Sequence, residues 1–187
     1  MTLPNLEIRV DERKLKGIER MLVGIPRGLP KVITRALNKT GAHARTETVR
    51  AITRKVAMRQ TDVRKDVTLR RASWRYWVAT IRIKGRRVPL IRFGARQVKR
   101  GTTYKIERGG GRATAPHAFI ATMPSGHVGV FKRKAGPRLP IGELKGPSVV
   151  SVFEKAPGLA ARMMADAGRR LETEMDRQVG VLLAKGR

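Results

Sequence analysis

The sequence predicts an α+β fold: an antiparallel sheet of about five strands, with a long helix in the N-terminal half and a long C-terminal helix. Apolar residues recur every three or four positions over 31–57 and over 159–185, which is typical of amphipathic helices. From residue 69 onward, apolar and polar residues alternate in several short runs, as in strands. Helices and strands kept apart along the chain favour helices packed on an antiparallel sheet.

The first part of the chain combines short elements with one long helix. Leu6, Ile8 and Val10 alternate with polar residues, as in a half-buried strand. Residues 11–22 have helical spacing, and the prolines and glycines of 24–30 end that helix. The apolar face of the helix at 31–57 is expected to consist of Ile33, Leu37, Ala44, Thr48, Ile52 and Val56.

The central part is expected to hold one short helix and several strands. Thr61 is placed to cap the short helix, with Asp62 near its positive end.

Pro89 lacks a backbone donor, so its strand is expected at a sheet edge. Residues 133–158 contain many prolines and glycines and are expected to lack long regular structure. Strands are predicted at 77–83, 88–93 and 102–107, and a hairpin at 118–133 with Phe119, Met123 and Val130 in the core.

The C-terminal helix is predicted from a single apolar stripe. Its members are Leu159, Met163, Ala167, Leu171, Met175, Val179 and Leu182. The expected organisation is therefore an N-terminal arm at 1–29, an α+β core domain at 30–155 and an amphipathic helix at 156–187. The length of 187 residues suits one domain, or one domain with a helical appendage.

Charge is the strongest compositional signal. The 187 residues include 42 Lys and Arg against 14 Asp and Glu, a net charge of +28. A folded chain with this charge repels itself, so a polyanion or an acidic protein is expected beside it. DNA is the default polyanion, since phosphate contacts release counterions.

Several classes of protein are excluded or disfavoured. The absence of cysteine excludes disulfides, thiol nucleophiles and cysteine metal sites. No apolar run is long enough for a membrane span, and the N-terminus lacks the apolar run of a signal peptide. A soluble protein without a membrane partner is therefore expected.

The basic residues concentrate in the middle of the chain. Residues 84–138 carry fourteen Lys and Arg and one acidic residue, Glu107. We hypothesise that the arginine-rich segment 84–112 within it faces DNA or an acidic protein neighbour, while the helices make contacts between subunits. The hypothetical contact residues are Arg82, Lys84, Arg86, Arg87, Arg92, Arg96, Lys99, Arg100, Lys105, Arg108, Arg112, Lys132 and Arg133.

A catalytic interpretation fits the sequence poorly. His117 and His127 flank Ser125, but a serine relay needs a carboxylate to orient the imidazole. Between residues 67 and 142 the only acidic residue is Glu107, which favours a strand hairpin. Residues 73–77, Ser-Trp-Arg-Tyr-Trp, are expected in core or interface packing rather than in a base-stacking platform. No catalytic residue and no cofactor are predicted.

Metal and phosphate-loop sites are also disfavoured. The third histidine, His43, is expected in the long helix, and the three histidines are too scattered for a metal site. Asp62 and Asp66 could share a helix face, but they are expected to be surface carboxylates rather than magnesium ligands. Residues 109–112 lack the spacing of a phosphate-binding motif. They are expected to form a loop between strands, with a mobile basic loop projecting toward DNA as the other interpretation.

Five blocks of sequence, in order, resemble the minor tail protein Z family of tailed bacteriophages and prophages. They are TRALNKTGAHARTETVRAI, DVRKDVTLRRASW, RVPLIRFGARQVKRGTTYKI, PHAFIATMPSGHVGVFKR and LPIGELKGPSVVSVF, within about residues 30–155. The resemblance implies a non-enzymatic virion protein that completes the long tail at its head-proximal end. It supplies no catalytic residues.

The resemblance also implies partners and a location. The partners are other tail and neck proteins, further copies of the chain in a ring that is often six-fold, and double-stranded DNA along the channel. The implied location is the phage tail in the virion, with the host cytoplasm as the site of assembly. The alternative is a non-specific DNA-binding protein acting by phosphate contacts, with affinity that falls steeply as salt rises. An enzyme would need an acid or metal cluster that the central region lacks.

Overall fold

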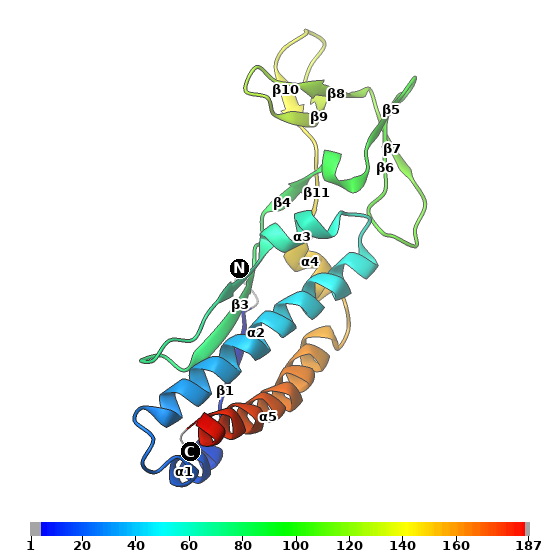
Figure 1. The fold of residues 1–187 in the computed structure, drawn as a ribbon. Helices are drawn as coiled ribbons and strands as arrows, with labels where there is room; N and C mark the ends of the chain where they lie inside the picture. Colours follow the sequence, from blue (N-terminus) through cyan, green and yellow to red (C-terminus); the bar gives the residue numbers. More distant parts are fainter. Residues whose placement is uncertain (1–4, 186–187) are drawn as a thin grey trace. The chain divides into compact units, whose positions relative to one another are not determined.

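The computed structural model describes residues 5–185 of the chain. This part contains five α-helices, one 3-10 helix and eleven strands (Figure 1). The predicted α+β class is confirmed, with a long helix in each half of the chain. The strands, however, form four antiparallel sheets of two or three strands each, where one sheet of about five was predicted. All eleven strands of the described residues are three to six residues long.

Contacts divide the chain into two compact units, each assembled from separate stretches. Unit 1 comprises the chain up to Thr48, Val67–Ile83, and the chain from Ala156 onward. Unit 2 comprises Val49–Asp66 and Lys84–Lys155. The residue ranges of the two units differ from the expected ranges 1–29, 30–155 and 156–187. The N-terminal segment and the C-terminal helix belong to the same unit, and residues 30–155 are divided between the two units.

Unit 1 is built on a three-stranded sheet in the order β1-β3-β2. The strands are β1 (Asn5–Arg9), β2 (Val67–Arg70) and β3 (Val78–Ile83). In the register of the sheet Ile81 lies opposite both Leu6 and Leu69. Leu6 and Ile81 are buried, as the alternation of apolar and polar residues predicts for one face of a sheet.

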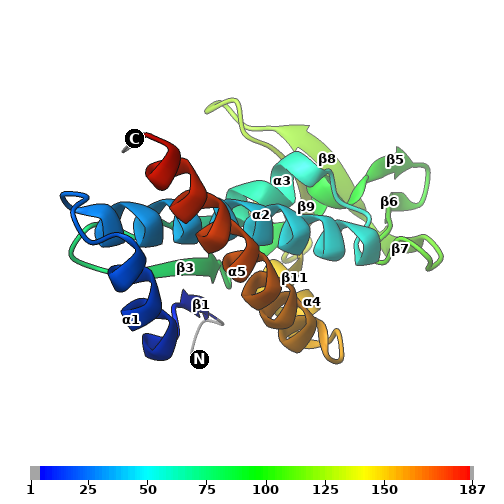
Figure 2. The ribbon, with the colours of Figure 1, turned by 60° about the horizontal axis from the view of Figure 1, so that its bottom comes forward.

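Three helices pack around this sheet, α1 (Glu12–Met21), the first part of α2 (Gly28–Lys55) and α5 (Leu159–Lys185) (Figures 1 and 2). All six apolar positions predicted for the first long helix are buried, although Val56 lies just beyond the end of α2. Six of the seven predicted in α5 are buried, with Met163 partly exposed. Glu174 of α5 is also buried and is surrounded by cations, with Lys39 at 4.0 Å, Arg170 at 3.4 Å and Arg177 at 3.0 Å.

Helix α2 approaches the sheet through a glycine and is fixed to it by an asparagine. A Cβ added at Gly41 would lie 2.9 Å from Leu69 Cδ1 and 3.3 Å from Ala79 Cβ. Asn38 donates to Ala72 O at 3.0 Å and accepts from Ala72 N at 2.9 Å. A glycine inside a helix costs stability relative to alanine, so Gly41 is explained here by close packing.

This packing predicts opposite effects for two glycine substitutions. Gly41→Ala gains helix propensity but overpacks the contact with Leu69 and Ala79, and we expect a net loss of about 1 kcal/mol in the free energy of unfolding. Gly168→Ala in α5 meets open space and should gain about 0.5–1 kcal/mol. Denaturant unfolding of both variants measures the two signs. A gain at Gly41 equal to that at Gly168 would contradict close helix–sheet packing.

Unit 2 consists of the last turns of α2, two short helices, a 3-10 helix and three small sheets. The helices are α3 (Gln60–Asp66), η1 (Leu90–Phe93) and α4 (Val149–Glu154), which Ser148 caps by accepting from Ser151 N. The sheets are β11-β4 (Lys145–Ser148 and Arg87–Pro89), β5-β6-β7 (Arg96–Val98, Gly101–Tyr104 and Ala113–Pro116) and β10-β9-β8 (Ile141–Glu143, Val128–Arg133 and Ala118–Thr122).

Several details of the central prediction are corrected in unit 2. The strand expected at 88–93 stops at Pro89, and residues 90–93 turn into η1, which ends at left-handed Gly94. The helix expected after Thr61 begins at Gln60, so Thr61 lies inside its first turn and does not cap it. The strand expected at 102–107 is β6, which ends at Tyr104.

The hairpin at 118–133 is confirmed as β8 and β9, with Phe119 opposite Phe131. Val130 is fully buried, as predicted. Phe119 and Met123, predicted in the core, are only partly buried. The small sheet β10-β9-β8 is covered incompletely, which leaves these two side chains at its margin.

The aromatic stretch at 73–77 does not enter the core of unit 1. Trp74 is 49% exposed and Tyr76 is 53% exposed. Arginine guanidinium groups lie over both rings, Arg27 at 5.7 Å from the Trp74 centroid and Arg70 at 5.5 Å from that of Tyr76. Cation–π contacts of this kind suit exposed rings on a highly basic chain.

Candidate functional site

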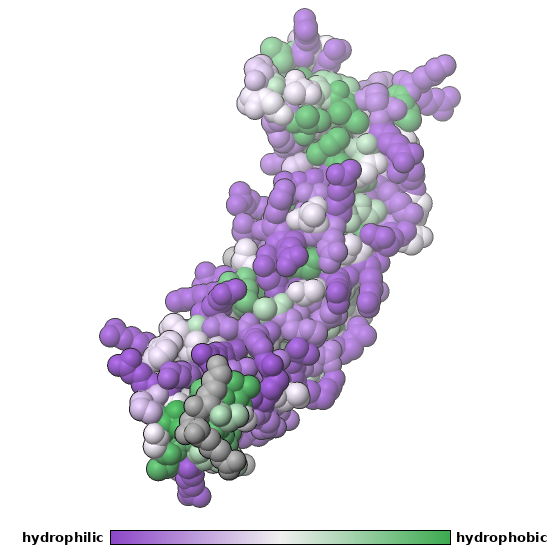
Figure 3. Space-filling model, in the orientation of Figure 1, coloured by the Kyte–Doolittle hydropathy of each residue, from purple (hydrophilic) through white to green (hydrophobic). Residues whose placement is uncertain are grey.

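The thirteen predicted contact residues lie on strands, on the 3-10 helix η1 and in connecting segments, almost all in unit 2. Arg82 is the exception and lies on β3 of unit 1. The other twelve lie on β4, η1, β5, β9 and the connecting segments of unit 2. Hydrophilic residues cover most of the face drawn in Figure 3. Unit 2 contains 22 Lys and Arg against five acidic residues, so most of the net charge of the chain belongs to it.

Three of the thirteen side chains are engaged within the protein. Arg92 forms an ion pair with Asp62 at 3.9 Å. Arg108 donates from Nε to Thr53 O at 3.1 Å, near the carboxyl end of α2. Arg112 donates to Gly94 O at 2.7 Å and to Thr103 O at 3.2 Å, so it holds the loop before β7 against its neighbours. Residues 109–112 form a loop between β6 and β7, as predicted.

The remaining ten side chains have no hydrogen bond or ion pair within residues 5–185. Eight of them are exposed, and Lys84 and Lys105 are partly exposed. Lys and Arg donors that the fold leaves unused are available to an external anion. The ten are Arg82, Lys84, Arg86, Arg87, Arg96, Lys99, Arg100, Lys105, Lys132 and Arg133.

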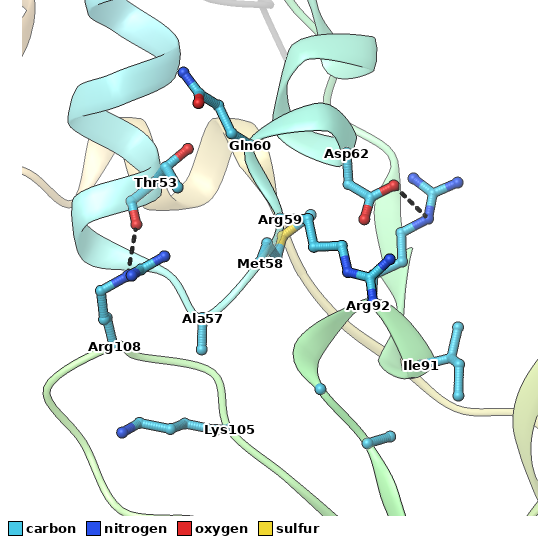
Figure 4. Close-up of a pocket in the computed structure, with 12 residues that line it drawn as sticks. Thr53, Ala57, Met58, Arg59, Gln60, Asp62, Ile91, Arg92, Lys105 and Arg108 are labelled. Atoms are coloured by element: carbon cyan, nitrogen blue, oxygen red, sulfur yellow. Dashed lines mark hydrogen bonds and ion pairs between the residues drawn. The ribbon is translucent and has the colours of Figure 1, made fainter.

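Part of the basic set meets in a hollow of about 850 Å³ in unit 2 (Figure 4). Arg59, Arg92, Lys105 and Arg108 contribute the positive charges, and Asp62 is the one acidic residue among its lining residues. We call it the basic hollow. Its neutral lining residues are Thr53, Ala57, Met58, Gln60, Ile91, Gly94 and Ala95.

The basic hollow includes residues that the sequence analysis missed. Arg59 follows α2 in a short connection and had no recognisable pattern around it. Arg50 and Arg54 line a smaller hollow of about 280 Å³ that shares Thr53, Gln60 and Arg108 with the basic hollow. These two arginines lie on the long helix outside its predicted apolar positions, so the helical periodicity of the sequence could have placed them on its outer surface.

The two aspartates of α3 are not simple surface carboxylates. The Asp62 side chain is 17% exposed, and besides Arg92 it has Lys65 at 3.9 Å. Burial raises the pKa of Asp66 above its ordinary value of 3.8, against the opposing effect of Arg92, Lys84 and Arg86. Within residues 5–185 no group of three or more His, Cys, Asp or Glu side chains could hold a metal ion.

The raised pKa of Asp66 predicts a pH dependence of stability. A carboxyl group with a higher pKa in the folded state binds protons more tightly when folded, so stability falls as pH rises from 3.8 through the raised pKa. The stability of the parent protein relative to Asp66→Asn should therefore decrease across this window. Denaturant unfolding of both proteins at a series of pH values measures the difference. A difference that grows as pH rises would contradict the assignment.

The structure does not assemble the two histidines and the serine into a relay. In the hairpin His127 lies beside the turn, while His117 precedes β8 at the opposite end, with φ of 59°. Ser125 has no side-chain hydrogen bond to either histidine within the described residues. His127 instead contacts Glu143 of β10, at 2.7 Å between Nε2 and Oε1.

Of three comparisons with known proteins, one found a match. A family model described as prophage minor tail protein Z (GPZ) matches residues 13–185. A search of curated proteins and a search of solved structures found no match. In the described part of the chain, no helix is long and apolar enough to cross a membrane.

Proposed function

This chain belongs to the prophage minor tail protein Z family, and from that membership we propose that it is a tail-completion subunit of a long-tailed bacteriophage. In this proposal it acts at the head-proximal end of the tail, in a homo-oligomeric ring around the path of the DNA. It performs no catalysis. Its partners are neighbouring tail and neck proteins, and its location is the virion after assembly in the host cytoplasm.

The observation that carries the proposal is the unneutralised charge of unit 2. Ten of the thirteen contact side chains, nine of them in unit 2, have no hydrogen bond or ion pair within the described residues, although Lys84 and Arg86 act electrostatically on Asp66. The unit holds 22 basic against five acidic residues. A surface of this kind repels copies of itself unless an anion lies close by. In a ring, each subunit would lie beside such an anion, which is either DNA in the central channel or an acidic neighbouring protein.

A ring also fits the general behaviour of identical subunits. A head-to-tail interface closes into a ring when the rotation per subunit divides a full turn. Short strands with free edges, such as β5 and β7 at the edges of their sheet, offer backbone donors and acceptors to a neighbour. Neither feature fixes the number of copies, so six-fold symmetry is part of the proposal.

The test is microscopy of intact tails. We expect density for this chain at the head-proximal end, in a closed ring, with Arg86, Arg96 and Arg100 directed at DNA or at an acidic subunit. Absence of the chain from particles would reject the tail-completion role. Those arginines pointing into bulk solvent would reject the electrostatic argument.

Measuring DNA affinity at increasing salt concentration distinguishes the proposed function from the alternative, a free DNA-binding protein. A free DNA-binding protein acting through phosphates binds duplex DNA tightly in isolation, with a steep loss of affinity as salt rises. For the tail subunit we expect weak binding by the isolated protein and co-purification with particles. Tight DNA binding by a monomer that is absent from particles would favour the alternative.

A further inference from the structure

The basic hollow combines fixed and free cations. Arg108 is held by Thr53 O at 3.1 Å, and Arg92 is paired with Asp62 at 3.9 Å, so both guanidinium groups have defined places. The side chains of Arg59 and Lys105 have no hydrogen bond or ion pair within residues 5–185. Two positioned and two unengaged cations around one carboxylate leave the hollow with a clear excess of positive charge.

Apolar residues share the lining with these cations. Met58, Ala57, Ile91 and Ala95 all line the hollow, and Met58 is only 4% exposed. A phosphodiester backbone inserted here would press charged oxygens against these groups, which costs free energy without a compensating hydrogen bond. A ligand with both carboxylates and apolar side chains matches the cations and the apolar lining together.

The size of the hollow also suits a ligand with several side chains. A volume of about 850 Å³ falls in the usual range for pockets that enclose small ligands or side chains, roughly 300–1,000 Å³. The adjoining smaller hollow shares Thr53, Gln60 and Arg108 and adds Arg50 and Arg54. Because the two hollows adjoin, an extended segment can lie along both.

We propose that the basic hollow receives an acidic peptide segment of a neighbouring protein that carries apolar side chains between its carboxylates. Carboxylates pair with Arg59 and Lys105, where arginine can bind a carboxylate through two parallel hydrogen bonds. An apolar side chain lies against Met58 and Ile91. The proposal rests on the proposed function in taking the neighbour to be a tail subunit, whereas the binding itself is a property of the isolated chain.

Paired variants of equal charge test the proposal on the full-length protein. The probe is a fluorescein-labelled decapeptide of alternating Glu and Leu, and binding is followed by fluorescence anisotropy at 0.15 M salt. The hollow variant is Arg59→Gln with Lys105→Gln. The control is Lys134→Gln with Arg138→Gln, which removes the same charge from two exposed side chains between β9 and β10 that line neither hollow. All substituted side chains are exposed or partly exposed, and far-UV circular dichroism checks that both variants are folded.

We expect the hollow variant to weaken peptide binding at least about tenfold and the control variant less than about twofold. A peptide of alternating Glu and Ser should bind the parent protein more weakly than the Glu-Leu peptide. Equal losses in the two variants would overturn the proposal, since only the total charge would then matter. A larger loss for a 24-base-pair duplex than for the peptide in the hollow variant would also overturn it, in favour of nucleic acid.

These outcomes are independent of the test of the proposed function. Microscopy that finds the chain away from the head-proximal end would reject tail completion and leave peptide binding intact. Loss of the specific peptide effect would reject the binding site while leaving the position in the tail untouched.

Discussion

Replacing Phe93 with alanine is expected to lower the free energy of unfolding by about 3–5 kcal/mol, the usual range for a buried phenylalanine. Phe93 is 1% exposed and ends the 3-10 helix η1. Its ring lies directly on the backbone at Gly146, where an added Cβ would be 2.6 Å from the ring Cε2. Removing the ring leaves a cavity against a backbone that cannot collapse freely.

Denaturant unfolding of the full-length protein measures this loss. Val128→Ala is the control, since Val128 is 43% exposed in the same unit, and we expect a loss well below 1 kcal/mol there. Gly146→Ala should destabilise the parent protein by displacing the ring, yet cost less when Phe93 is already alanine. Additive effects of the two substitutions would contradict direct contact between them.

The second large effect is expected at Gly101, the first residue of β6. Its φ of 142° is a conformation that residues with a side chain rarely adopt. A Cβ there would lie 2.2 Å from Ala115 O, a backbone atom of β7. Gly101→Ala therefore combines backbone strain with a clash that only movement of β7 can relieve. We expect a loss of about 2–6 kcal/mol in the free energy of unfolding.

Gly109→Ala provides the matched control. Gly109 lies in the loop between the same two strands, its φ is outside the left-handed region, and an added Cβ meets no atom within 4 Å. We expect a change within about 0.5 kcal/mol. Amide hydrogen exchange should show faster exchange in β6 and β7 of Gly101→Ala only. Equal stability of the two variants would contradict the close approach of Gly101 to the β7 backbone.

The long helices could be predicted because their burial repeats along the sequence. Ile33 and Leu37 in α2, and Leu171 and Met175 in α5, each lie four residues apart and are buried. This spacing brings them to one face of a helix whatever the rest of the chain does. The same argument works for β3, where Ala79, Ile81 and Ile83 alternate with polar neighbours and are buried.

The division into small sheets could not be predicted in this way. Strand β11 is Lys-Gly-Pro-Ser and β10 is Ile-Gly-Glu, and neither has an apolar alternation. Their strand pairing depends on partners far along the chain, as when Lys145 lies opposite Pro89. The turn into η1 at Leu90 likewise interrupts an alternation that would otherwise continue a strand. The local sequence pattern shows which residues are apolar. It does not show which strands from distant parts of the chain pair with each other.

The candidate site shows the same limit. Sequence located the excess of basic residues, because charge can be counted without a structure. It could not distinguish Arg112, whose guanidinium donates to two backbone carbonyls, from Lys105, whose side chain has no hydrogen bond or ion pair within the described residues. It also missed Arg59, which only the return of residues 91–108 toward the end of α2 brings to the basic hollow. Partners and concavity arise from tertiary structure, and both are needed to define a binding site.

The discontinuous composition of unit 1 has a consequence for synthesis on the ribosome. Every segment of unit 2 has been translated once Lys155 is added, but unit 1 still lacks α5 at that moment. Until α5 follows, Leu22 and Val32 are without Val179 and Leu182, with which they form one apolar cluster. A chain interrupted before α5 therefore exposes apolar surface and is expected to be degraded. We therefore expect that only chains carrying the C-terminal helix persist long enough to assemble.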